Sequence, residues 1–138
     1  MSDRLDFTAI QNAFNGSPFI AWLNMTVVSV DYDAEELVVH IPMKPEFERG
    51  SGSRQWHGGP LAAVIDTVGD FALGMLLGRG LPTINFRVDY LRPAVDTSLK
   101  AVARVRRNGR SVGVADVELY NEHGALLAIG RATYSTLS

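Results

Sequence analysis

Residues 56–77 read WHGGPLAAVIDTVGDFALGMLL, and this stretch decides the fold. From Pro60 onward the apolar residues cover a wide helical face. Pro60 suits the first turn of a helix, and Gly78 and Gly80 are typical of a helix end. We therefore predict one long helix over residues 60–77, most of it buried.

The segments on both sides of this helix have the composition of β-strands. Strands are predicted over residues 25–33, 36–43, 83–90, 98–107, 111–120 and 125–134, from β-branched residues, alternation and turn signals such as Asn108-Gly109. Residues 1–23 are predicted to form an N-terminal helical segment, and residues 44–56 a loop. One long helix with six strands favours an α+β fold in which an antiparallel sheet wraps around the helix.

Length and composition limit the possible functions. A chain of 138 residues is expected to form a single domain over residues 1–138. The net charge of −2, without a long basic run, argues against binding to nucleic acid. No cysteine is present, which excludes disulfides and thiolate chemistry, and the three histidines lack metal-ligand spacing. Asp66 and Asp70 break the longest apolar run, so we expect a cytoplasmic protein without a membrane span.

The start of the predicted helix carries the residues with chemical potential. Gly58 and Gly59 leave backbone N–H groups accessible where the helix dipole is positive, and such donors can hold a developing oxyanion. Asp66 lies in an otherwise apolar run, where a carboxylate is costly unless it has partners or a task. Each feature alone is more often structural, but together they indicate a catalytic site.

Three segments, HGGPLAAVID, TINFRVDYLRPA and RNGRSVGVADVELYNEHGALLAIGRATY, resemble the hotdog-fold thioesterase superfamily. The resemblance covers about residues 18–135, and the phenylacetyl-CoA thioesterase-like branch is the most similar. It implies a hotdog fold and hydrolysis of an acyl-CoA to a free acid and coenzyme A. No cofactor is implied, since coenzyme A is part of the substrate. The family also implies a homodimer, and its dimers often pair into tetramers.

The resemblance implies roles for residues at matching positions. Gly58 would donate its N–H to the thioester carbonyl, and Asp66 would be the nucleophile or the general base for water. Thr83 would orient the attacking water, and His57 would line the site. The further candidates for substrate binding are Gly59, Ser51, Gln55, Trp56, Asp70, Asn85, Arg92, Arg107, Arg110 and Ser111.

Two positions depart from the family pattern. Many relatives have Asn or Gln six residues before the motif histidine, where this chain has Ser51, although Gln55 is nearby. Relatives often have Ser or Thr four residues after the acid, where this chain has Asp70. Because Asp66 and Asp70 share a helix face, their charges should raise one pKa, and we hypothesise that Asp70 makes Asp66 a better base. The alternative is that Asp70 is solvated or capped by an arginine.

The spacing within the helix also bears on assembly. Gly58 and Asp66 are eight residues apart, which corresponds to ~12 Å along one helix. Both can hardly contact one carbonyl carbon from the same chain. We therefore expect the site to lie between two subunits with antiparallel helices, twice per dimer.

The acyl pocket should be apolar, and Trp56 is the residue that we expect to contact ligand. Phe71 and Phe86 are predicted to be core residues rather than pocket residues. Around the 108–109 turn, Arg104 and Arg106 are expected to be solvated. The two arginines that flank the turn, at positions 107 and 110, are candidates to contact phosphates of coenzyme A.

Three other functions compete with hydrolysis as explanations of these sequence features. A hotdog dehydratase or hydratase would need a catalytic histidine and a Phe-Pro-Gly type loop, which the sequence lacks. A non-catalytic acyl-CoA binding or sensing module would keep the pocket but would not need Asp66. A role in assembly alone would leave the polar helix-start motif unexplained. Sequence does not distinguish the acyl chain, aryl preference, pathway, dimer from tetramer, or the two roles of Asp66.

Overall fold

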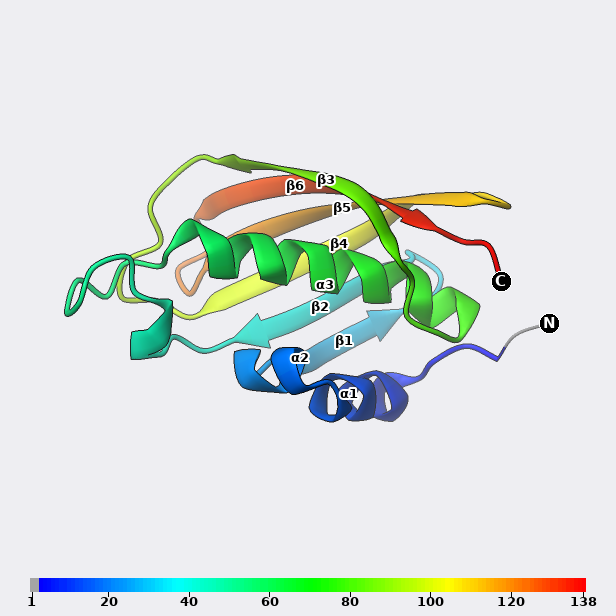
Figure 1. Cartoon of the computed structure of the whole chain (residues 1–138), viewed down its shortest axis with the longest axis horizontal. Coiled ribbons are helices and arrows are strands. Elements are labelled where there is room, and N and C mark those ends of the chain that lie inside the picture. Colours follow the sequence, from blue (N-terminus) through cyan, green and yellow to red (C-terminus); the bar gives the residue numbers. More distant parts are fainter. Residues whose placement is uncertain (1–2) are drawn as a thin grey trace.

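The computed structural model describes residues 3–138, in which a curled antiparallel sheet surrounds one long helix (Figure 1). The sheet has six strands in the order β1-β2-β4-β5-β6-β3. This confirms the predicted α+β architecture. In chain order the elements are α1 (Phe7–Gly16), α2 (Pro18–Leu23), β1 (Thr26–Asp31), β2 (Glu36–Ile41), the 3-10 turn η1 (Pro45–Phe47), α3 (Gly58–Leu77), β3 (Thr83–Tyr90), β4 (Leu99–Asn108), β5 (Val112–Asn121) and β6 (Leu126–Ser135).

Helix α3 begins at Gly58, two residues before the predicted start at Pro60. The reason is a side-chain cap: His57 has extended backbone angles, and its Nδ1 accepts the N–H of Gly59 at 2.9 Å. The cap satisfies one of the orphan N–H groups of the first turn. At the other end Gly78 adopts the left-handed conformation with φ of 83°, which confirms the predicted helix end.

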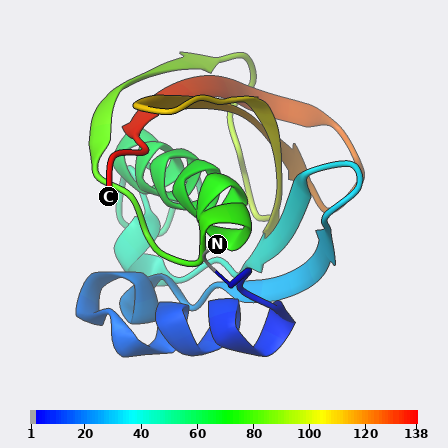
Figure 2. The same cartoon turned by 90° about the vertical axis from the view of Figure 1, so that its right-hand side faces the viewer.

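The apolar surface of α3 explains its central place. By length and composition the helix could cross a bilayer, but here it lies against the concave face of the sheet (Figure 2). Leu61, Val64, Ile65 and Val68 are buried in the core that α3 shares with the sheet. Burial of such side chains contributes about 1.5–3 kcal/mol each relative to exposure.

The N-terminal helices cover one edge of the sheet. Ile10 and Phe14 of α1 are buried in the main core. Gln11 contacts β1 and the residue before it, donating to the carbonyl of Met25 at 3.0 Å and accepting the N–H of Val27 at 2.8 Å. Since these bonds occupy backbone groups at the β1 edge, the edge is protected against pairing with another chain.

The opposite edge of the sheet, strand β3, remains uncovered by any other strand within residues 3–138. Ile84 is 54% exposed and Phe86 is 40% exposed. The prediction that Phe86 belongs to the core is therefore wrong for the single chain, because β3 is an edge strand. Phe71, by contrast, is buried as predicted and packs edge-on against Phe14.

Helix α3 and the sheet approach each other closely at Gly130 on β6. A Cβ at Gly130 would lie 2.5 Å from Cγ2 of Ile65 and 3.0 Å from the Arg87 carbonyl oxygen. Gly130→Ala should therefore lower the free energy of unfolding by about 1–3 kcal/mol, as overpacking does. Urea unfolding measures this.

The control is Gly16→Ala at the end of α1, where a Cβ would meet nothing within 4 Å. That change should be neutral or slightly stabilising, since alanine favours helix more than glycine does. Equal unfolding midpoints for Gly130→Ala and wild type would contradict the close approach of β6 to Ile65.

Candidate active site

Asp66 and Thr83 meet within one chain. Asp66 lies in the middle of α3 and is partly exposed, while Thr83 opens β3. The Thr83 hydroxyl donates to Oδ1 of Asp66 at 2.7 Å. A donor at this distance fixes the orientation of the carboxylate. The other oxygen, Oδ2, has no hydrogen-bond donor within residues 3–138. The structure thus brings together two of the residues that the sequence selected.

Asp70 lies one turn after Asp66 and faces the chain entering β3. Its Oδ1 accepts the backbone N–H of Leu81 at 2.7 Å. Burial raises the pKa of Asp70 from 3.8 to about 7; the Leu81 bond opposes this rise and the charge of Asp66 adds to it. The alternative that Asp70 is solvated or arginine-capped is therefore wrong. The predicted upward shift is present, but burial is its main cause.

Tyr134 of β6 is a site residue that the sequence did not reveal. Its ring is fully buried, and its hydroxyl donates to the backbone carbonyl of Asp66 at 2.6 Å. Burial, with the charges of Asp66 and Asp70, raises the pKa of Tyr134, so the hydroxyl keeps its proton. A Cβ at Gly69 would lie 2.5 Å from this oxygen. A glycine inside the helix was the available signal for this close approach.

A second group of candidate residues lies at the start of α3. The His57 N–H donates to the carbonyl of Phe47 at 2.7 Å, and the Gly59 N–H is taken by the His57 ring. The Gly58 N–H has no acceptor among residues 3–138. Gly58 therefore keeps the donor expected of it, whereas the Gly59 donor is occupied. Tyr90 donates to the Gly58 carbonyl at 2.8 Å and ties β3 to the helix start.

A cavity of about 450 Å³ opens beside Gly58. Gln55 and Arg92 line it, as does Arg49, which the sequence did not single out. Trp56 also lines it, but the indole is 3% exposed and donates its Nε1–H to the Thr97 carbonyl at 2.9 Å. Most of that ring therefore belongs to the core.

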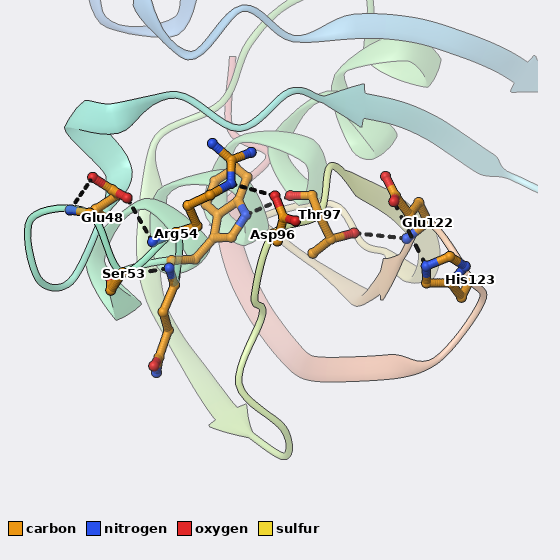
Figure 3. Close-up of polar contacts among 10 residues, drawn as sticks. Glu48, Ser53, Arg54, Asp96, Thr97, Glu122 and His123 are labelled. Carbon is orange, nitrogen blue, oxygen red and sulfur yellow. Dashed lines mark hydrogen bonds and ion pairs between the residues drawn. The ribbon is translucent and has the colours of Figure 1, made fainter.

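The segment before α3 is held by its own polar contacts (Figure 3). The carboxylate of Glu48 accepts the N–H groups of Gly52 at 3.1 Å and Arg54 at 2.6 Å. Arg54 in turn forms an ion pair with Asp96, next to the residue that accepts from Trp56. These contacts position Gln55 beside the cavity. Ser51 lies exposed at the tip of this segment and does not line the cavity.

The remaining candidates are separated from the cavity within one chain. Asn85 is exposed on β3. Arg107, Arg110 and Ser111 lie at the β4–β5 hairpin, toward the C-terminal end of α3 and away from Gly58 (Figure 1). Elsewhere on the sheet Arg104 and Arg106, which the sequence predicts to be solvated, form exposed ion pairs. Such pairs contribute little to stability. Within residues 3–138, no group of three His, Asp or Glu side chains is placed to hold a metal ion.

Comparison with known proteins places this arrangement in a family. Residues 55–128 match the profile of the thioesterase superfamily. The chain belongs to this superfamily. A solved structure of a thioesterase-superfamily protein superimposes with a TM-score of 0.87 at 32% identity, covering 94% of this chain and 96% of that one. The hotdog fold expected from the sequence is confirmed.

Two curated acyl-CoA thioesterases from Escherichia coli are similar to this chain in sequence. The medium/long-chain acyl-CoA thioesterase YigI is 35% identical in an alignment of 94 positions that covers 56% of this chain and 60% of YigI. The chain thus spans less than two thirds of YigI. The acyl-coenzyme A thioesterase PaaI is 31% identical over 79% of this chain and 75% of PaaI.

Asp70 should make the folded protein less stable as the pH rises. An unfolded Asp ionises near pH 3.8, whereas folded Asp70 keeps its proton up to about pH 7. Between these values the folded state binds more protons, so the free energy of unfolding falls with rising pH. At about 1.4 kcal/mol per pH unit, the loss is at most about 4 kcal/mol.

Urea unfolding of wild type and Asp70→Asn from pH 4 to pH 8 checks this. Asp70→Asn should reduce the fall and be the more stable protein at pH 8, because asparagine has no charge to desolvate. Asp33→Asn, in the exposed turn after β1, should behave as wild type does. Parallel curves for wild type and Asp70→Asn would show that Asp70 ionises normally.

Proposed function

We propose that this protein is an acyl-CoA thioesterase that hydrolyses an acyl-CoA to a free acid and coenzyme A. The observation that carries the proposal is the Asp66 carboxylate, oriented by Thr83 at 2.7 Å on a helix that is otherwise almost wholly apolar. A carboxylate in an apolar run is costly unless it has partners or a task, and here Thr83 binds one oxygen and leaves the other free. The names of YigI and PaaI support the same activity.

In the proposed reaction, Asp66 acts through the carboxylate oxygen that Thr83 leaves free. It either attacks the thioester carbonyl and displaces the coenzyme A thiolate, giving a mixed anhydride that water then hydrolyses to the free acid, or it removes a proton from a water that attacks the carbonyl and displaces the same thiolate. In both routes negative charge develops on the carbonyl oxygen. The Gly58 N–H and the positive end of α3 would stabilise that oxyanion, an effect worth about 3–4 kcal/mol for one good donor.

The two halves of this machinery are separated in a single chain. Gly58 and Asp66 are about 12 Å apart along α3. Strand β3 passes both, since Thr83 contacts Asp66 and Tyr90 contacts Gly58. Antiparallel pairing of two β3 edges would place the Thr83 end of one copy beside the Tyr90 end of the other.

We therefore propose a homodimer with two sites, each combining Asp66 of one copy with Gly58 of the second. The pairing would also cover the exposed Ile84 and Phe86 of β3. Such dimers would pair further into a tetramer, as the family resemblance implies. The cytoplasmic location expected from the sequence belongs to this proposal too.

The substrate side of the proposal rests on the cavity beside Gly58. Trp56, Leu61 and Leu91 give it apolar walls suited to an acyl or pantetheine chain. Arg92 and Arg49 line the same cavity and would contact a phosphate of coenzyme A. The arginines at the β4–β5 hairpin stay candidates for the same task at a site shared between copies.

Hydrolysis is tested by thiol release from short, medium, long-chain and aryl acyl-CoAs. Wild type should act on at least one class, and Asp66→Asn should lose about 100-fold or more in kcat, because asparagine neither attacks nor accepts a proton. Asp33→Asn, which removes an exposed carboxylate, is the control. If wild type releases thiol from no member but binds coenzyme A tightly, the protein is an acyl-CoA binding or sensing module instead.

The shared site is tested by mixing two inactive variants. Gly58→Pro removes the N–H donor at a helix position that favours proline, and Gly58→Ala adds a Cβ but keeps the donor. Gly58→Pro and Asp66→Asn should each be inactive, whereas Gly58→Ala should retain most activity. The two inactive variants are then mixed in equal amounts, dissociated and allowed to reassociate. About half of the dimers should be hybrids, and each hybrid has one intact site of two, so about a quarter of wild-type activity should return.

Native mass spectrometry provides the control for this mixing experiment by counting hybrid dimers. Hybrid dimers without recovered activity would mean that Gly58 and Asp66 of the same chain serve one thioester.

A further inference from the structure

We infer that Asp70 is a positioning residue, which holds the chain entering β3 so that the Thr83 hydroxyl meets Asp66. The inference rests on the proposed function, because it concerns the geometry of the proposed carboxylate. The proposed role requires only a hydrogen-bond acceptor oxygen on residue 70 within reach of the Leu81 N–H. This differs from the hypothesis that the charge of Asp70 makes Asp66 a better base.

Two matched contacts carry the inference. Asp66 and Asp70, one turn apart on α3, accept from Thr83 and Leu81, two residues apart on the connected segment. Both contacts are 2.7 Å long. Residues i and i+4 of a helix share a face, so both carboxylates point toward the segment from the same side of α3. Asp66 binds a side-chain hydroxyl of the segment and Asp70 binds a backbone N–H, and together they hold the segment at two points two residues apart.

Arg79 holds the start of this segment by donating to the carbonyl of Thr136 at 2.9 Å, but between Leu81 and Thr83 the other hydrogen bonds are few. Pro82, between the two contact points, has no N–H, and its carbonyl accepts from Ser135 at 2.9 Å. The β3–β6 register shifts between Thr83 and Asn85, so regular pairing is interrupted where the strand begins. Leu81 is buried, and Asp70 is the acceptor of its N–H. Without Asp70, a buried donor would lose its bond.

Tyr134 completes the arrangement from the sheet. It stands opposite Thr83 in the β3–β6 register, and its hydroxyl donates to the carbonyl of Asp66. One residue thus contacts the backbone of both members of the catalytic pair. Asp70 sets the position of Thr83 from the helix, and Tyr134 sets the position of Asp66 from the sheet.

The decisive comparison is between Asp70→Asn and Asp70→Val, which have similar volumes. Asn keeps an acceptor for Leu81, while Val does not. Asp70→Asn should keep kcat within about 3-fold of wild type, and Asp70→Val should lose about 10–100-fold in kcat with little change in KM, as displaced catalytic groups do. The rescue by Asn and the separation of kcat from KM are effects that a purely structural role would not produce.

Amide hydrogen exchange at Leu81 reports the contact independently of activity. Exchange should be faster in Asp70→Val by about 10-fold or more, and close to wild type in Asp70→Asn. Tyr134→Phe gives a second test, since it removes the bond to Asp66 without touching Leu81. It too should lower kcat rather than raise KM, and it should leave Leu81 exchange unchanged.

Each alternative outcome has a separate meaning. If Asp70→Val keeps the kcat of wild type, the positioning role is refuted while the thioesterase proposal stands. If Asp70→Asn loses as much as Asp70→Val, charge rather than an acceptor is needed, and the inference fails. The pH–rate profile of Asp70→Asn distinguishes a need for the charge of Asp70 from a need for its acceptor oxygen, because Asp66 and Tyr134 are the titratable groups beside Asp70. If wild type hydrolyses no acyl-CoA, the proposed function fails first, and the catalytic role of Asp70 fails with it.

Discussion

The burial of an apolar helix inside a curled sheet is the constraint on which the rest of this structure depends. Helix α3 packs on β4, β5 and β6, and its carboxylates must find partners in a mostly apolar setting. Asp66 takes the Thr83 hydroxyl and Asp70 takes the Leu81 N–H. Both partners belong to the chain that leads from the helix into β3. The need to satisfy two buried or half-buried acids therefore fixes how β3 returns along α3.

The two edges of the sheet differ in how far they are covered, and this difference bears on the proposed function. At the β1 edge, Gln11 occupies backbone groups and α1 covers the core. At the β3 edge, apolar side chains such as Ile84 stay exposed. Gly58 and Asp66 are both tied to β3, through Tyr90 and Thr83. The uncovered edge is thus also the edge along which the candidate catalytic groups are arranged, and it is the edge at which the proposed homodimer would place its second copy.

The sequence predicts the structure where the structure is local. Periodicity predicts α3 and all six strands, and the glycine pair and the acid in the apolar run indicate Gly58 and Asp66. The sequence does not predict features that long-range contacts decide. The helix starts at Gly58 because the His57 ring folds back as a cap. The hydroxyl of Tyr134 and the N–H of Leu81 reach α3 through the tertiary fold, so no short motif encodes those contacts. The exposure of Phe86 depends on which strand lies at the edge, and alternation does not specify strand order.

The presence of an acid at position 70, where the family resemblance leads us to expect Ser or Thr, has a physical reason in this geometry. A hydroxyl in a helix interior readily bonds to the carbonyl four residues before it, and then no longer serves the chain outside the helix. An ionised carboxylate has no proton to donate and extends one atom further, so it accepts from Leu81. With a pKa of about 7, Asp70 is often protonated at neutral pH, but the neutral carboxyl retains an acceptor oxygen. The attachment of β3 can therefore persist while the charge beside Asp66 changes with pH.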